Sequence, residues 1–177
     1  PEPDDIVIVM DPGMAFGTAE HGTTRGSLRL LARALKVDDR ILDVGSGSGI
    51  LAIAATALGA SEAIAIEGDS PSFEALQRNV EENAVSSRIN CVEEWADTQS
   101  LQAMGPVDGI VANIETGVLC SFLPTFRNVL IEDGWLVLSG ILSMEWPRFL
   151  ENTKAEGFRC VEVDSDGEWT SGLFRSV

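Results

Sequence analysis

The stretch that decides the fold is Asp43-Val44-Gly45-Ser46-Gly47-Ser48-Gly49-Ile50. A short strand-like segment at 40–44 leads into it, and a dense apolar segment at 49–58 follows it. Together they predict a strand that turns directly into a helix through a glycine loop. Glycine adopts positive φ without a steric penalty and has no Cβ, so the backbone of such a loop can come close to a bound ligand.

Outward from this loop, strand-like and helix-like segments alternate, which predicts an α/β fold with helices on both faces of a mostly parallel sheet. The seven expected strands lie at 40–44, 63–67, 89–92, 107–112, 135–139, 158–163 and 169–175. Helices are expected from Thr23 or Thr24 onward and at 49–58, 70–83, 116–130 and 147–156, with an interruption at Pro124. The last two strands have only a short connection, so they must be antiparallel, which places one reversed strand near an edge.

The first expected helix has two different faces. Thr23 or Thr24 is expected to cap it, because a hydroxyl can accept a hydrogen bond from a free amide of the first turn. Arg29, Arg33 and Lys36 lie opposite its leucines. We interpret this basic stripe as a solvent-exposed helix face.

The composition indicates one acidic globular domain. The chain has 177 residues, of which 28 are acidic and 12 basic, giving a net charge of −16. This charge argues against a nucleic-acid partner, because phosphate binding needs clustered cations. The uncharged segment 44–61 begins with glycines and serines and does not fit a membrane span, and no signal peptide precedes it. Three cysteines, an odd number, indicate reduced thiols and a cytoplasmic protein.

The acid that follows the second strand suggests which ligand the glycine loop binds. Glu67 lies 22 residues after Gly45, where a carboxylate can accept both ribose hydroxyls of an adenosine. The spacing is G-x-G-x-G, with Ile50 where the dinucleotide fingerprint needs its third glycine, and no Gly-Lys-Ser/Thr follows. A ribose acid without a phosphate partner favours S-adenosylmethionine as the cofactor. A tight strand-to-helix turn without a ligand is the alternative interpretation.

Other motifs make the chain similar to a known family. They are Asp11-Pro12-Gly13-Met14-Ala15-Phe16-Gly17-Thr18 with His21 and Thr23-Thr24, then 45–51, Ala112-Asn113-Ile114 and Leu138-Ser139-Gly140-Ile141-Leu142. Over essentially its whole length the chain resembles the bacterial methyltransferases of ribosomal protein L11. The resemblance implies a class I Rossmann-like fold and S-adenosylmethionine-dependent methyl transfer to amines of a ribosomal protein. It also implies one domain over 1–177, in which segment 1–24 covers the cofactor and 25–177 forms the Rossmann-like core.

The resemblance also assigns residues. It implies that Thr24, Gly45, Glu67 and Asn113 contact the cofactor. The other expected cofactor-binding residues are His21, Ser46, Gly47, Gly49, Glu94 and Trp95.

Asn113 is the expected catalytic residue. Its carbonyl can accept a hydrogen bond from the attacking amine and so align the nitrogen lone pair. Two interpretations stay open for several of these residues: Asn113 can simply close a turn, Trp95 can stack on adenine or pack in the core, and Glu115 or solvent can deprotonate the amine. His21, the only histidine, is expected to order the loop over the methionine end of the cofactor or to act as a base, and no metal site is expected.

The chain departs from the family pattern at Ala19, at Glu67 in place of aspartate, and at Glu94-Trp95 where adenine binds. Family members carry a separate N-terminal domain that recognises the ribosomal protein, which these 177 residues do not contain. The expected acceptor is therefore a protein, with a basic ribosomal protein favoured. The alternatives are a methyltransferase of a small molecule or an unrelated protein, and a non-catalytic cofactor-binding subunit.

Overall fold

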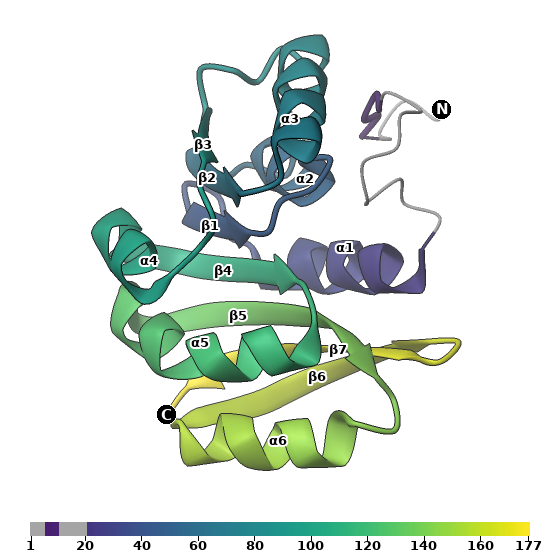
Figure 1. Cartoon of the computed structure of the whole chain (residues 1–177), viewed down its shortest axis with the longest axis vertical. Helices are drawn as coiled ribbons and strands as arrows, with labels where there is room; N and C mark the ends of the chain where they lie inside the picture. Colours follow the sequence, from purple (N-terminus) through teal and green to yellow (C-terminus); the bar gives the residue numbers. More distant parts are fainter. Residues whose placement is uncertain (1–5, 11–20) are drawn as a thin grey trace.

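A single sheet of seven strands organises the chain in the computed structural model, which describes residues 6–10 and 21–177 (Figure 1). The strand order is β3-β2-β1-β4-β5-β7-β6. The strands are β1 (Arg40–Val44), β2 (Glu62–Glu67), β3 (Ile89–Glu93), β4 (Val107–Asn113), β5 (Leu130–Leu142), β6 (Phe158–Asp166) and β7 (Trp169–Ser176). The helices are α1 (Gly22–Ala34), α2 (Ile50–Ala57), α3 (Ser70–Glu82), α4 (Thr98–Met104), α5 (Thr116–Val129) and α6 (Trp146–Ala155).

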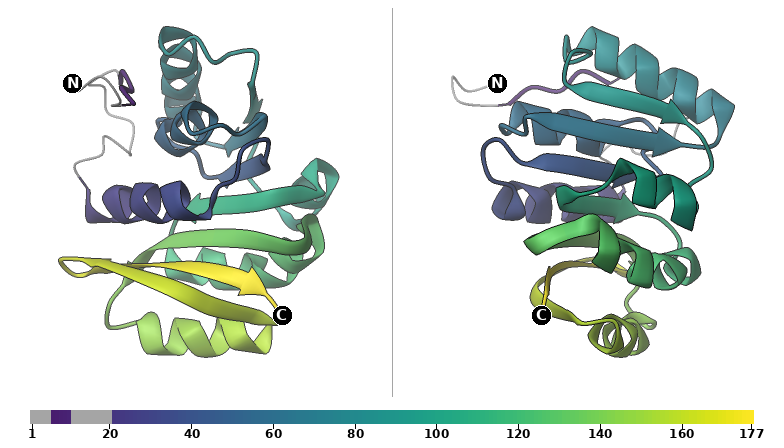
Figure 2. Two further views of the ribbon diagram at one scale, coloured as in Figure 1. Left: turned by 180° about the vertical axis from the view of Figure 1, so that it is seen from behind. Right: turned by 90° about the vertical axis from the view of Figure 1, so that its left-hand side faces the viewer.

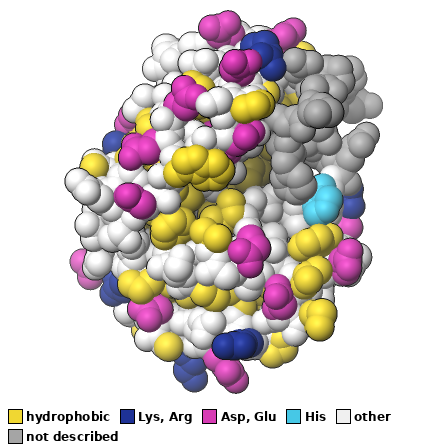
Figure 3. Space-filling model, viewed as in Figure 1, with side chains coloured by type: hydrophobic (Ala, Val, Ile, Leu, Met, Phe, Trp, Pro, Cys, Tyr) yellow, Lys and Arg dark blue, Asp and Glu magenta, His cyan; other side chains and the backbone are white. Residues whose placement is uncertain are grey.

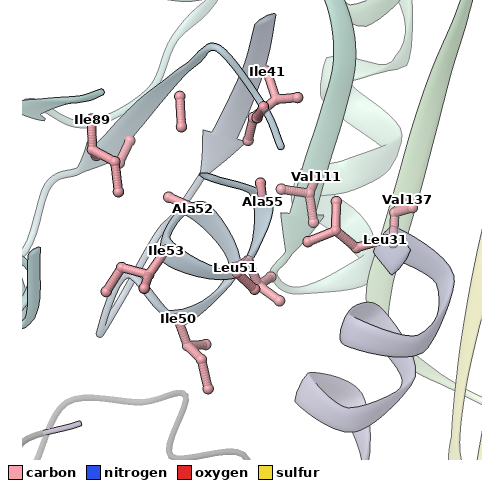
Figure 4. Packing of buried hydrophobic residues seen from close by; sticks show 14 of the residues in the cluster. Leu31, Ile41, Ile50, Leu51, Ala52, Ile53, Ala55, Ile89, Val111 and Val137 are labelled. Atoms are coloured by element: carbon pink, nitrogen blue, oxygen red, sulfur yellow. The ribbon is translucent and has the colours of Figure 1, made fainter. Parts of the chain in front are cut away.

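Three helices cover each face of the sheet, so the core has two halves (Figure 2). One half joins α1, α2 and α3 to the strands, and the other joins α4, α5 and α6 to the opposite face. In the first half, Leu31 of α1 lies beside Val111 and Val137, and the side chains of α2 fill the adjoining space (Figure 4). The central strands β1 and β4 are buried on both faces, as strands of a parallel sheet covered by helices usually are.

The predicted fold class is confirmed. Strands β1 to β5 pair in parallel, and β7 lies antiparallel between β5 and β6. One helix differs from expectation, because α5 continues through Pro124 without an interruption. Burial of Leu119, Leu123 and Phe126 on the same helix stabilises it on both sides of the proline. The short helix α4 was not predicted.

The start of α1 differs from the predicted cap. His21 is the N-cap residue, and its ring nitrogen Nδ1 accepts from the backbone N–H of Thr23 at 3.4 Å. Thr23 and Thr24 lie inside the first turn, and both are buried. The expected division between 1–24 and 25–177 therefore lies inside α1. The motif at 11–18 lies outside the described residues.

The basic stripe is solvent-exposed as predicted, since Arg29, Arg33 and Lys36 are all exposed. Its arginines in addition form surface ion pairs with the edge strand β6. Arg25 binds Asp166 through two hydrogen bonds of 2.8 and 2.9 Å. Arg29 binds Asp164 through two more, of 2.6 and 2.7 Å, and Arg33 pairs with Glu162. We call these residues the ionic ladder. The guanidinium of Arg25 lowers the pKa of Asp166 to about 2.

The geometry of the ladder follows from the two backbone repeats. Four residues of an α-helix rise about 6.0 Å, and two residues of a strand rise about 6.7 Å. Arginines at every fourth position of α1 therefore keep step with acids at every second position of β6. The ladder joins the N-terminal helix to the last strand pair, more than 120 residues apart in sequence.

No helix among the described residues is long and apolar enough to cross a membrane.

Replacing the central arginine tests the ladder. Arg29→Met removes a bidentate pair but preserves helix propensity, and we expect the free energy of unfolding to fall by about 1 kcal/mol or less. The difference should shrink in about 1 M NaCl, where the Debye length is only ~3 Å. Chemical denaturation at both salt concentrations measures it. Arg148→Met is the matched control, because Arg148 is exposed on α6 and forms no ion pair with a described residue; an equal loss there would contradict the assignment.

Candidate functional site

The register of the parallel strands brings the predicted site residues together. Val44 of β1 lies opposite Ile66 of β2 on one side and opposite Ala112 of β4 on the other. The next residue along each strand direction is a predicted site residue, namely Gly45, Glu67 or Asn113. Three residues far apart in sequence are thus neighbours at the carboxyl edge of the sheet, where ligands bind in open α/β folds.

The loop after β1 has the backbone that its glycines predict. Gly45, Gly47 and Gly49 have φ values of +69°, +53° and +82°. A Cβ at Gly45 would collide with the side chain of Ile114, the residue after Asn113. The hydroxyl of Ser46 donates to the Asp43 carbonyl at 3.0 Å, so this side chain stabilises the turn from within.

Glu67 is already engaged with this loop. One carboxylate oxygen accepts from the N–H of Gly47 at 2.8 Å, and the other accepts from the N–H of Asp69 at 2.9 Å. The residue is only 8% exposed. Because each carboxylate oxygen has a further lone pair, Glu67 can hold the loop and still accept from ligand hydroxyls. The sequence predicted the ligand contact and missed the contact with the loop.

Of the three buried side-chain oxygens without a hydrogen-bond partner among the described residues, two are Thr24 Oγ1 and Asn113 Oδ1. Both residues line the same small cavity of about 20 Å³, together with Gly45, Ser46 and Gly47. A buried polar atom without a partner costs about 1–3 kcal/mol, so such atoms indicate a bound group that satisfies them. The site therefore fits a polar ligand seated between the glycine loop, β4 and the first turn of α1.

A second cavity, of about 250 Å³, continues from Gly45 and Glu67 towards Glu94, Trp95 and Glu115. Figure 3 shows hydrophobic side chains gathered around a hollow near the middle of the face in view, with acidic side chains nearby. Trp95 is 73% exposed, so it is not a core tryptophan. Its indole packs against Gly68, where any Cβ would overlap the ring. The cavity offers a flat apolar wall and carboxylates, which suits a planar base.

His21 connects to the site through other residues. Its Nδ1 lies 2.7 Å from Thr23 Oγ1, and Thr23 Oγ1 accepts from the Asn113 Nδ2 at 3.1 Å. The imidazole also packs beside Trp169, with 5.1 Å between ring centroids. Thr23 was not predicted as a site residue. Its only sequence signal is its place within the Thr23-Thr24 pair.

The described residues contain no group of three or more His, Cys, Asp or Glu side chains that could hold a metal ion. A larger cavity of about 590 Å³ lies between α6 and the first residues of β6. None of its lining residues is a predicted site residue. Phe158 in its wall lies opposite Ser176 at the end of β7, so this cavity is remote from the carboxyl edge.

The carboxyl group of Asp43 is buried directly beneath the glycine loop. One oxygen accepts from the N–H of Ala52 at 3.1 Å, and the other has no described partner. Burial raises the pKa of Asp43 to about 7, which the Ala52 hydrogen bond opposes and the Glu67 carboxylate reinforces. Near neutral pH, this group can therefore carry a proton in the folded protein.

This pKa predicts a pH-dependent stability. In the unfolded chain an aspartate titrates near pH ~4, so between about pH 4 and 7 the folded state holds one more proton. The contribution of Asp43 to the free energy of unfolding is fully present below this pH range and is lost as the pH rises towards 7. Asp43→Asn removes the titration but keeps the shape and the acceptor for Ala52.

We expect the free energy of unfolding of Asp43→Asn, minus that of the wild type, to grow by a few kcal/mol between pH 5 and 8, measured by urea denaturation. Asp108→Asn is a control for a carboxylate that accepts from the Arg40 N–H at 2.8 Å away from the loop. A difference between wild type and Asp43→Asn that does not vary with pH would contradict the prediction.

The comparisons with known proteins agree with this geometry. The family model described as ribosomal protein L11 methyltransferase (PrmA) matches residues 1–176. A ribosomal protein L11 methyltransferase of Gloeobacter violaceus is 38% identical over 169 residues, which cover 96% of this chain and 52% of the relative. The corresponding protein of Thermus thermophilus is 38% identical over 165 residues, covering 93% of this chain and 63% of the relative. The chain thus spans about half the length of the first of these relatives.

Solved structures give the same result. The crystal structure of a ribosomal protein L11 methylase from Lactobacillus delbrueckii subsp. bulgaricus matches with a TM-score of 0.86 and 31% identity, covering 98% of this chain and 86% of that chain. A methyltransferase from Pyrococcus furiosus, at 16% identity and a TM-score of 0.77, shares the fold. With its glycine loop, the buried Glu67 at the end of β2 and a family match over residues 1–176, this chain belongs to the ribosomal protein L11 methyltransferase family.

Proposed function

We propose that the chain is the catalytic domain of an S-adenosylmethionine-dependent methyltransferase that modifies amino groups of ribosomal protein L11. One observation carries the proposal: Thr24 Oγ1 and Asn113 Oδ1 are buried without a described partner and line one cavity with the glycine loop. Family membership supports the acceptor, since the relatives are named for ribosomal protein L11.

The residues present fit the cofactor. The glycine loop gives a close backbone approach, Glu67 has lone pairs for ribose hydroxyls, and the cavity beside Trp95 suits adenine. Thr24, in the first turn of α1, offers a buried hydroxyl and the positive end of a helix to a carboxylate. When bound, S-adenosylmethionine supplies an electrophilic methyl group on a positively charged sulfur. We propose that the segment 1–24 covers this cofactor.

Asn113 is the residue we assign to the acceptor amine. Its Oδ1 can accept one N–H of the amine and thereby direct the nitrogen lone pair at the methyl carbon. Methyl transfer would form a nitrogen–carbon bond and break the methyl–sulfur bond, with S-adenosylhomocysteine as the leaving group. Solvent or a base such as Glu115 would take the proton that the amine loses. Alignment and exclusion of water supply most of the rate in such a direct displacement.

The charge of the chain supports a cationic acceptor. The net charge is −16, and a field of this sign steers basic proteins towards the site. Its three cysteines are free, which supports a cytoplasmic location, where ribosomal proteins are found.

Glu67 variants test the cofactor site. Glu67→Gln offers one acceptor where the backbone amides of Gly47 in the loop and of Asp69 after β2 need two, so binding of S-adenosylhomocysteine should weaken by about 1.5–3 kcal/mol. This is an increase in Kd of about 12- to 140-fold, at ~1.4 kcal/mol per tenfold. Isothermal titration calorimetry measures it. Glu74→Gln, which makes the same charge change on the exposed face of α3, should bind like the wild type. Tight binding of NAD in place of S-adenosylhomocysteine would overturn the cofactor assignment.

Asn113 variants test the transfer. Asn113→Ala should lower the single-turnover rate by a larger factor than it raises the Kd of S-adenosylhomocysteine, because the side chain aligns the nucleophile. The assay follows labelled methyl from S-adenosylmethionine into purified bacterial ribosomal protein L11. Asn90→Ala, on the exposed side of β3, is the control. Equal losses in rate and binding for Asn113→Ala would reduce Asn113 to a binding residue.

The same assay also tests the acceptor. Lysine-rich peptides and a metabolite extract are offered beside ribosomal protein L11, at low and high salt. Label that enters ribosomal protein L11 at a rate that falls with salt supports the proposal. Label only in small molecules, or no label at all, would overturn it.

A further inference from the structure

We propose that Thr23 is a positioning residue that fixes the side-chain amide of Asn113 with its oxygen turned towards the acceptor amine. The catalytic consequence of this position rests on the proposed function, whereas the position itself rests on a series of hydrogen bonds. The series runs from His21 Nδ1 through Thr23 Oγ1 to Asn113 Nδ2, with distances of 2.7 and 3.1 Å.

The hydrogen bonds of this series all run in one direction. The backbone N–H of Thr23 caps α1 by donating to His21 Nδ1 at 3.4 Å, and we assign the tautomer in which this nitrogen is the acceptor and carries no proton. The Thr23 hydroxyl therefore donates its single proton to Nδ1, and towards Asn113 it can only accept. An acceptor there selects the NH₂ end of the Asn113 amide. The carbonyl end must then point the other way.

The other end of the amide is where the reaction needs it. Asn113 Oδ1 is buried, has no described partner and belongs to the side chain that lines the cavity with Thr24 and the glycine loop. An amide turned the opposite way would present its NH₂ group to the attacking amine. It would then donate to the nitrogen lone pair that must stay available. The direction of these hydrogen bonds thus decides whether Asn113 accepts from the nucleophile or blocks its lone pair.

The backbone of Thr23 is fixed from two sides. Its carbonyl accepts from the hydroxyl of Ser27 at 2.8 Å and from that of Ser139 at 3.1 Å. Ser139 pairs directly with Asn113 in the β4–β5 register and also bonds to Ser171 of β7. Thr23 is 1% exposed, so water does not compete for its hydroxyl. The site consequently depends on β5 and β7 as well as on β4.

Two variants at one position separate the hydroxyl from the packing. Thr23→Val keeps the branched shape and the backbone contacts but lacks the hydroxyl, and Thr23→Ser keeps the hydroxyl. We expect Thr23→Val to lower kcat for methylation of ribosomal protein L11 on the order of 100-fold, as misplacement of a reacting group does. The Kd of S-adenosylhomocysteine should change little, and Thr23→Ser should retain most of the wild-type kcat. Circular dichroism confirms that each variant is folded.

A second measurement does not depend on turnover. The chain has one histidine, so ¹⁵N-histidine labelling gives the ring-nitrogen signals of His21 alone. We expect Nδ1 to be an unprotonated acceptor in the wild type and in Thr23→Ser, with its signal shifted in Thr23→Val. Unchanged ring signals in Thr23→Val, or an unchanged kcat, would overturn the inference. If the wild type transfers no methyl group, the proposed function fails, and the ring signals still decide whether the hydrogen-bond chain exists.

Discussion

The alignment of Val44, Ile66 and Ala112 across three parallel strands is the constraint on which the site depends. In a parallel sheet the register sets which residues emerge together at the carboxyl edge, and a shift of one position would turn each side chain to the other face. Here the residues that emerge are a glycine, a glutamate and an asparagine. Gly45 therefore contributes backbone without a side chain, Glu67 a carboxylate and Asn113 an amide to the same site.

Two buried carboxylates next to the glycine loop, Glu67 and Asp43, already accept hydrogen bonds from backbone amides. Glu67 accepts from the amide of Gly47 in the loop and from that of Asp69 after β2, and Asp43 beneath the loop accepts from Ala52 of α2. The two acids thus fix the loop and the start of the helix that follows it before any ligand binds. Their proximity has an electrostatic cost, which is visible in the raised pKa of Asp43. A preorganised loop reduces what a ligand must spend on ordering the backbone.

Helix α1 completes the site from the opposite end of the chain. The ionic ladder aligns the helix along β6. The hydroxyls of Ser27 and Ser139 hold its first turn by donating to the carbonyl of Thr23. The antiparallel pair β6–β7 thus holds the helix that carries His21, Thr23 and Thr24. In this fold the reversed strand pair has a direct structural connection to the cofactor site, although none of its residues was predicted to belong there.

Much of the molecule followed from sequence alone. The periodicity of short apolar runs predicted the strands of the parallel sheet, and the glycine spacing located the ligand loop, because both depend on local backbone preferences. Only the tertiary structure showed the acidic partners of Arg29 and Arg33 on β6. It also showed that His21 caps α1 and that Thr23 contacts Asn113. Each involves partners that are near in space and distant along the chain, or a choice between adjacent polar residues that local propensity does not distinguish. The direction of the Asn113 amide belongs to this second group, since only the neighbouring hydroxyl decides which end faces the ligand.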